Sequence, residues 1–423
     1  MKRLSSAAGL AIVVLAVLGL FGPVSAAPPN FAPPDGPGPF NVGVTTFPTV
    51  MSGGRPTLVQ VFYPTLDEFD EDSKYTILYA ADSYQLRSPL GAVRDAPAAP
   101  GLFPLVVHDH GGAGAGHDWQ RISQIPLHEA MASHGLVTVV ALHSANPVAR
   151  VRDLSLVIDV LLDRSANHDD LLSDSIDPAR IGISGQSAGG AAAIGVAAGW
   201  TANGIVADPR IKAMVLYEPG AQYSLDDAST LSMPYLVMGG AQHRAGLAIP
   251  TLFDATVAAS PRYYVLSPNA THFNYITGMA PEIDQTREAA LLADPTLPEP
   301  LTTLTPSNAA AARAYELWNF GEILFPLLGH GAGSGRNFCN RVGVDSIRSL
   351  DADGDGFTDS PPFMASDSFT LKPAIPEETM VPLIKLYTIA FWKSFLDGDH
   401  RYRSFLTPGF ANRNELEALV WIE

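Results

Sequence analysis

The chain has almost no cysteine, little positive charge and no apolar run of membrane-spanning length. Its 423 residues include one cysteine, Cys339, so no internal disulfide can form and stability must come from the core. We interpret Cys339 as a buried small residue, because nothing around it resembles an activated thiol site. Lysine and arginine total 26 against 43 aspartates and glutamates, giving a net charge of −17. This balance argues against nucleic acids and anionic membrane surfaces as partners.

The N-terminus has the pattern of a secretory signal peptide. Lys2 and Arg3 precede an apolar stretch at residues 10–20, and residues 24–26 (Val-Ser-Ala) are small enough for cleavage. The apolar stretch is too short for a stable membrane span. We therefore expect residues 1–26 to be removed on export, leaving a secreted or periplasmic protein. An uncleaved anchor helix is the alternative.

Apolar, β-branched segments alternate with helical patterns over much of the chain. This alternation predicts an α/β fold with a mostly parallel, doubly wound sheet, in which reactive groups collect at the C-terminal ends of the strands. The helical patterns include residues 122–133, 151–164 and 380–396. The expected strands are residues 57–63, 103–110, 136–142, 180–184, 211–217, 233–238 and 262–266.

The alternation is interrupted late in the chain, which sets the expected domain organisation. Residues 27–39 form a Pro-rich arm that we expect to be extended and poorly ordered. Residues 40–278 and 380–423 are expected to form one domain. Residues 279–379 are then a large insertion before the last helix, placed to form a lid over the active-site face.

One motif points directly to chemistry. Residues 185–189 read Gly-Gln-Ser-Ala-Gly, after a β-branched run and before an Ala-rich helical stretch. This pattern at a strand–turn–helix junction is typical of a nucleophilic serine. Gly185 and Gly189 lack a Cβ, so strand and helix can approach closely. We predict that Ser187 is the nucleophile, on a cramped turn, and that the N–H of Ala188 is one oxyanion donor.

A nucleophilic serine needs a base that accepts its proton and a second oxyanion donor. His272 follows the expected strand at residues 262–266 and is the predicted base, with His243 as the alternative. The loop His110-Gly111-Gly112 follows the expected strand at residues 103–110. Gly112 is the predicted second donor, because a Gly-rich loop lets backbone N–H groups approach the oxyanion.

The acid that orients the base has several candidates. Glu218 comes directly after the expected strand at residues 211–217, so it is the first choice. Asp226 and Asp227 lie on a following loop that could fold over the site, and Asp254 falls on an expected helix. These three aspartates remain alternatives.

Together these motifs resemble the secreted α/β-hydrolases, in the broad group that contains plasma-type platelet-activating-factor acetylhydrolase, dienelactone-hydrolase-like proteins and bacterial cutinase-like polyester hydrolases. The resemblance covers residues 40–278 and 380–410. The segments that carry it are 59–64 (Val-Gln-Val-Phe-Tyr-Pro), 103–112, 152–154 (Arg-Asp-Leu), 180–187, 271–273 (Thr-His-Phe) and 390–399.

The resemblance implies an α/β-hydrolase fold and hydrolysis of small-molecule or lipid-like carboxylic esters, with no cofactor in the chemistry. It also places an acid at the position of Glu218, where the acetylhydrolase-like branch uses Asp. Compact polyester hydrolases lack a segment like residues 279–379, so acceptance of polymers stays open. A peptidase or amidase on the same fold, and a catalytically silent binding protein, are the alternatives.

An aspartate-rich loop lies within the expected insertion. Asp351, Asp353, Asp355 and Asp359 stand at the first, third, fifth and ninth positions of a calcium-loop spacing, with Gly356 at the sixth. The twelfth position is Pro362 instead of a bidentate glutamate, so a site here would be weak. The loop therefore predicts either a structural calcium site or a solvated acidic turn.

Overall fold

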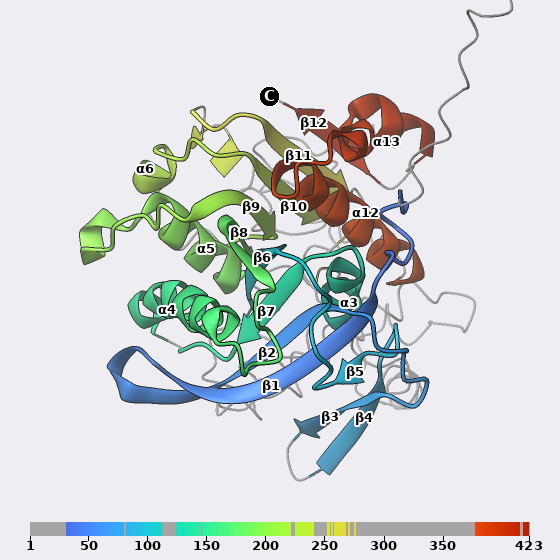
Figure 1. Cartoon of the computed structure of the whole chain (residues 1–423). Helices are drawn as coiled ribbons and strands as arrows, with labels where there is room; N and C mark the ends of the chain where they lie inside the picture. The colour runs from blue at the N-terminus through green and yellow to red at the C-terminus, as the bar shows by residue number, and fades with distance from the viewer. Residues whose placement is uncertain are drawn as a thin grey trace, which may run out of the picture.

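The computed structural model has an α/β fold, with a mixed, mostly parallel sheet between two layers of helices (Figure 1). The predicted signal peptide (1–26) lies wholly outside the residues that the structure describes. Of the predicted insertion (279–379), the structure describes only residues 377–379. In full, the described residues are 31–79, 82–111, 124–144, 146–220, 225–240, 252–253, 255–256, 258–267, 270, 275, 377–414 and 418–422.

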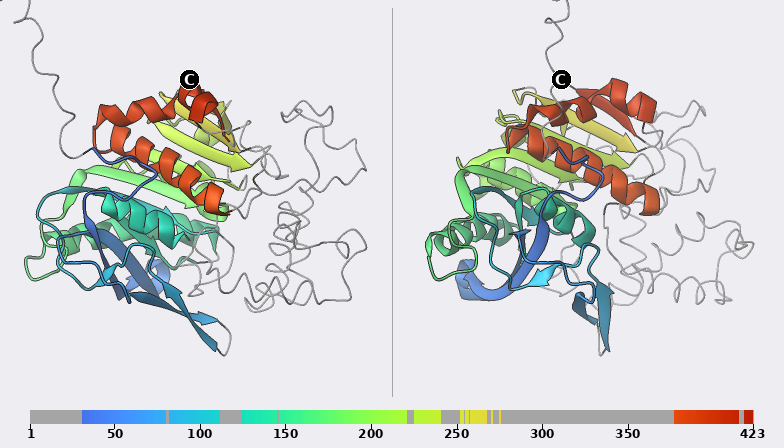
Figure 2. Two further views of the ribbon diagram at one scale, coloured as in Figure 1. Left: turned by 90° about the vertical axis from the view of Figure 1, so that its right-hand side faces the viewer. Right: turned by 45° about the vertical axis from the view of Figure 1, so that its right-hand side comes forward.

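Within these residues the main sheet has ten strands in the order β12-β11-β10-β9-β8-β6-β7-β2-β1-β5. All neighbours from β7 to β11 pair in parallel, whereas β2 is antiparallel to both β1 and β7, and β12 is antiparallel to β11. The hairpin β3–β4 projects from the body of the molecule (Figure 2). The strands are β1 (Asn41–Met51), β2 (Arg55–Thr65), β3 (Lys74–Tyr79), β4 (Asp82–Arg87), β5 (Val93–Arg94), β6 (Phe103–Asp109), β7 (Val137–Ala141), β8 (Ile176–Gln186), β9 (Ile211–Tyr217), β10 (Tyr235–Gly240), β11 (Arg262–Ser267) and β12 (Leu419–Ile422).

Two pairs of helices cover the two faces of the sheet (Figures 1 and 2). Helices α4 (Pro147–Ala166) and α5 (Ala188–Ala198) share one buried cluster with the sheet, and α3 (Ile125–Ser133) and α12 (Glu377–Phe395) share another. Among the described residues, none of the helices combines the length and apolarity that a membrane crossing requires. The shorter elements are α6 (Leu225–Ala228), α13 (Pro408–Asn414), η1 (Ser52–Gly54), η2 (Thr201–Asn203) and η6 (His400–Leu406).

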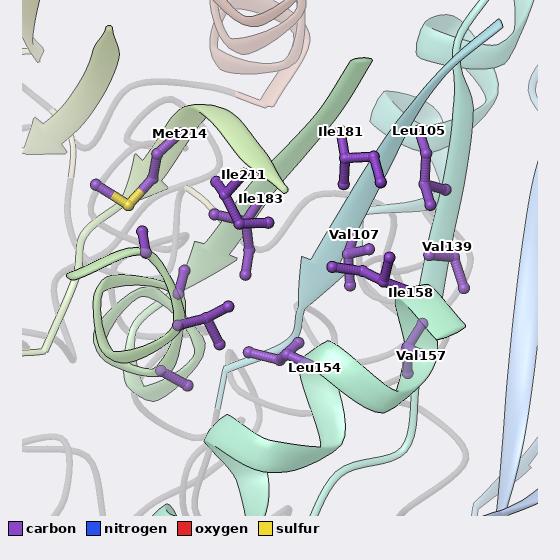
Figure 3. Packing of buried hydrophobic residues seen from close by; sticks show 14 of the residues in the cluster. Leu105, Val107, Val139, Leu154, Val157, Ile158, Ile181, Ile183, Ile211 and Met214 are labelled. Atoms are coloured by element: carbon purple, nitrogen blue, oxygen red, sulfur yellow. The ribbon is translucent and has the colours of Figure 1, made fainter. Parts of the chain in front are cut away.

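The packing of α4 shows how its sequence positions it. Asn146 caps the helix, since its side-chain oxygen accepts a hydrogen bond from the N–H of Ala149 at 3.0 Å. Leu154, Val157 and Ile158 recur at helical spacing and pack against the sheet around Val107 and Val139 of β6 and β7 (Figure 3). Central strands are buried on both faces, as parallel strands between helices must be.

Residues 31–39 of the predicted Pro-rich arm pack against α3 and the C-terminal region. Phe31 lies 5.0 Å from the ring of Tyr402, whose hydroxyl donates to the carbonyl of Ala32 at 2.7 Å. The N–H of Gly38 donates to the hydroxyl of Ser133 in α3 at 2.9 Å. Aromatic packing and hydrogen bonds thus hold residues 31–39 against the domain and offset the low hydrophobicity of the segment.

Candidate active site

Ser187 occupies a sharp turn between β8 and α5, as the sequence predicts. Its φ of 56° and ψ of −119° are rare for a residue with a Cβ, and such a conformation costs about 1–3 kcal/mol. A Cβ on Gly185 would collide with the backbone of Gly189, and one on Gly189 would collide with the carbonyls of Asp109 and His110. Only glycine fits at either position, so the turn can be as tight as the serine requires.

Two backbone hydrogen bonds, one to the end of β9 and one to the turn after it, hold Ser187 in place. The N–H of Ser187 donates to the carbonyl of Tyr217 at 3.0 Å, and its carbonyl accepts from the N–H of Gly220 at 2.8 Å. The turn that contains Pro219 also packs against α5, because a Cβ on Gly190 would approach Pro219 to 2.9 Å. The strained conformation of Ser187 is thus fixed by its neighbours, which is how such conformations persist in folded proteins.

Glu218 lies in the turn that follows β9 and is also unusual in its backbone. Its φ is 46° and the residue is only 1 % exposed. One carboxylate oxygen accepts a hydrogen bond from the N–H of Gly240 at the end of β10, and the N–H of Glu218 donates to the carbonyl of Met238 at 2.9 Å. Its side chain is therefore held at the same edge of the sheet as Ser187.

The region around Glu218 includes residues close in sequence to the predicted base. A Cβ on Gly240 would collide with the carbonyl of Ala270. Burial raises the pKa of Tyr275 well above its ordinary value, and repulsion from the Glu218 carboxylate adds to this increase. His272 itself, like the alternative base His243, lies outside the described residues.

Of the three alternative acids, only Asp227 has a side chain that the structure describes. Asp227 accepts hydrogen bonds from the N–H of Thr201 at 3.2 Å and from its hydroxyl at 2.7 Å. Thr201 follows the C-terminal end of α5, whose 11 residues extend about 16 Å from the turn at Ser187. The prediction that Asp227 could act over the site is therefore wrong. Asp254 and the side chain of Asp226 lie outside what the structure describes.

The loop after β6 reaches Ser187, at the place where the sequence predicts an oxyanion loop. A Cβ on Gly111 would come 3.3 Å from Cβ of Ser187 and would collide with the side chain of Gln186. Ala188 is the first residue of α5, where a backbone N–H has no partner within the helix. The described loop ends at Gly111, so the second predicted donor, Gly112, lies just outside it.

Beneath this loop is a buried ion pair that the sequence interpretation missed. Arg150 of α4 donates from Nε to Asp109 Oδ2 at 2.6 Å and from Nη2 to Asp109 Oδ1 at 2.8 Å. Nη2 also donates to the carbonyl of His110. Helical spacing in the sequence could have indicated this pair. Arg150 stands four residues before Leu154, on the apolar face of α4, and a charge on that face needs a buried partner.

The partners of His110 define its tautomer. Its Nδ1 lies 2.8 Å from the carbonyl of Gly111, which can only accept a hydrogen bond. Its Nε2 lies 3.2 Å from the backbone N–H of His143, which can only donate. His110 is therefore neutral with the proton on Nδ1. Burial, aided by the charge of Arg150, lowers its pKa to about 3.

Among the residues that the structure describes, His110 is one of five buried histidines whose pKa is lowered, in each case chiefly by loss of solvation. An unfolded chain takes up these protons near the ordinary pKa of 6.5, whereas the folded chain resists them. Glu129 acts in the opposite sense, because burial raises its pKa and its protonation favours the folded state as the pH falls. The lowered values are about 3 for His110, His128 and His143 and about 4 for His134, with His108 also well below 6.5.

We therefore expect the folded state to lose stability steeply on acidification. Each histidine contributes fully above pH 6.5, and between pH 6.5 and its folded pKa the loss is about 1.4 kcal/mol per pH unit. Urea unfolding at pH 7, 6, 5 and 4 measures this slope. His128→Gln should make it shallower by one proton. A free energy of unfolding that stays constant from pH 6.5 to 4.5 would contradict the expectation.

In the described part of the chain, no group of three or more histidines, cysteines, aspartates or glutamates is arranged to hold a metal. Asp351, Asp353, Asp355 and Asp359 lie outside that part, so the calcium site stays a prediction.

Comparisons with known proteins leave the chain without a family assignment. No protein-family model matches the sequence. No curated protein matches it either.

Proposed function

We propose that this protein is an exported serine hydrolase that cleaves carboxylic esters through an acyl-enzyme. The observation that carries the proposal is the conformation of Ser187, a non-glycine residue at φ 56° between a buried strand and a helix. A strained strand–turn–helix junction of this kind presents a serine hydroxyl at the C-terminal edge of the sheet.

The order and directions of the strands in the sheet support an α/β-hydrolase fold. The parallel strands β7, β6, β8, β9, β10 and β11 are flanked by β2, which runs antiparallel to its neighbours. The serine follows β8 and the carboxylate follows the adjacent strand β9, so the chain order agrees with Ser, then Asp or Glu, then His.

The chemistry assigns one task to each residue. In the first step His272 accepts the proton of Ser187 as the oxygen attacks the ester carbonyl, and the N–H groups of Ala188 and Gly112 stabilise the oxyanion. The alcohol leaves with the proton from His272, which gives the acyl-enzyme. Water then attacks by the same route and releases the acid.

Glu218 is the proposed acid that orients His272. Support comes from its burial and from the hydrogen bond that Gly240 donates to its carboxylate. Gly240 also packs closely on Ala270, and the carboxylate acts electrostatically on Tyr275. These two residues bracket His272 in the sequence, two residues before it and three after it. No cofactor enters this scheme.

The experiment that tests the function is a substrate series. Initial rates are measured on p-nitrophenyl esters of increasing acyl length, with a p-nitroanilide of the same acyl group as control. Rapid hydrolysis of the esters with an initial burst of nitrophenol is expected, together with slow cleavage of the anilide. Equal rates on ester and anilide would favour a peptidase or amidase. No turnover of either, with no burst, would favour a silent binding protein.

A further inference from the structure

Arg150 is a buried charged residue that the proposed chemistry does not use. It lies in the first turn of α4 and is 2 % exposed. Its guanidinium reaches the end of β6, where it binds both carboxylate oxygens of Asp109 at 2.6 and 2.8 Å and the carbonyl of His110. A buried guanidinium with this forked geometry binds at fixed angles, so it constrains the position of what it holds.

The segment held by Arg150 contacts the nucleophile turn on its other side. The Cα of Gly189 packs so closely on the carbonyls of Asp109 and His110 that a Cβ would collide with both. Gly111 lies against Gln186 and Ser187. Residues 109–111 are thus confined between α4 and the turn that presents Ser187.

The hydrogen bonds also set the direction of the peptide groups in this segment. In a trans peptide the C=O of one residue and the N–H of the next point in opposite directions. The carbonyl of His110 points to Arg150, so the N–H of Gly111 points away from it. The carbonyl of Gly111 accepts from the Nδ1–H of His110, so the position of this carbonyl is fixed as well.

We propose that Arg150, paired with Asp109, is the positioning residue of the oxyanion loop. Through the carbonyl of His110 it fixes the direction of the peptide that joins His110 to Gly111, which lies against Ser187. The inference rests on the proposed function, since it gives Arg150 a role only if an oxyanion forms beside Ser187.

Loss of this constraint affects one step of the reaction. An oxyanion donor stabilises the transition state and contributes about 10²–10³ in kcat when it is fixed in advance. Because the charge develops only in the transition state, a misplaced donor lowers kcat and leaves ground-state binding unchanged. A side chain that only stabilised the fold would change the melting temperature and not these quantities.

The test needs variants that fold. Arg150→Met alone would leave Asp109 buried without a partner, which is strongly destabilising. The double variant Asp109→Leu/Arg150→Met replaces the pair with apolar groups of similar size. Arg150→Lys is a second route, because it keeps the charge opposite Asp109 and loses the fork.

For the double variant, kcat on a p-nitrophenyl ester should fall by about 10–100-fold while KM stays within about twofold. The inhibition constant of an alkyl boronic acid, which forms a tetrahedral adduct on the serine, should rise by the same factor as kcat falls. Arg150→Lys should show the same pattern with a smaller factor.

The matched control is a partly buried Arg–Asp pair that joins β2 to α4. Arg55 binds Asp153 at 2.7 Å and the carbonyl of Leu142 at 2.9 Å, and neither contact involves residues 109–111. Arg55→Met/Asp153→Leu should lower the melting temperature and leave kcat and boronate inhibition as in the wild type. Wild-type kcat and inhibition in both Arg150 variants, or equal losses in the control, would overturn the positioning role. A wild-type protein without turnover or boronate inhibition would instead overturn the proposed function.

Discussion

Replacing Ser187 with alanine is expected to lower kcat on a short ester by about 10⁴ or more. The reason is that the hydroxyl is the only proposed nucleophile, so the acyl-enzyme cannot form without it. The measurement is steady-state hydrolysis of a p-nitrophenyl ester, together with mass-spectrometric detection of the adduct with a fluorophosphonate. The wild type should carry one adduct, on Ser187, and the alanine variant none.

A glycine at the same position provides the control for folding. Glycine adopts a φ near 56° without steric cost, whereas alanine keeps the strain of the native serine. Ser187→Gly should be as inactive as Ser187→Ala and should melt at a higher temperature. If Ser187→Ala retained full esterase activity, the nucleophile would lie elsewhere and the proposed function would be wrong.

Replacing Glu218 with glutamine is the second large expected loss, about 10⁴ in kcat. Glutamine keeps the shape of the side chain and an oxygen for the N–H of Gly240, so the fold should persist. The lost negative charge leaves the base without the group that orients its ring and stabilises its protonated form. Fluorophosphonate should still label the variant slowly, because Ser187 and the oxyanion donors remain.

Asp227→Asn is the matched control for Glu218→Gln. It removes a carboxylate from the same part of the chain, at a position where the structure commits the side chain to Thr201. Activity should stay within about tenfold of the wild type. If Asp227→Asn lost more activity than Glu218→Gln, Glu218 would not be the orienting acid, although the esterase proposal would remain. Asp226→Asn and Asp254→Asn complete the comparison.

Features defined by neighbouring residues were predictable from the sequence. The strand β9 has the predicted bounds, Ile211–Tyr217, because a dense apolar run ends abruptly at Glu218-Pro219. The turn at Ser187 was predictable for the same reason, since the serine and its two glycines lie within five residues. Both depend on local sterics and periodicity.

Features that depend on pairing with another segment of the chain were missed. The strand β1 (Asn41–Met51) has an interrupted alternation with Pro48 near its centre, and its pairing with β2 stabilises it. The last strand, β12, has only four residues and pairs with β11. Arg150 and Asp109 are 41 residues apart, so no local pattern brings them together.

The C-terminal helix α12 has a consequence for how the chain comes to be folded. Trp392 packs against Cα of Gly182 so closely that a Cβ there would collide with it, and Arg180 pairs with Asp397 at 2.7 Å. The face of the sheet that α3 and α12 share therefore stays only partly covered until nearly four hundred residues have left the ribosome. A nascent chain that completes its core this late is still unfolded when a translocation channel would receive it, as the proposed export would require.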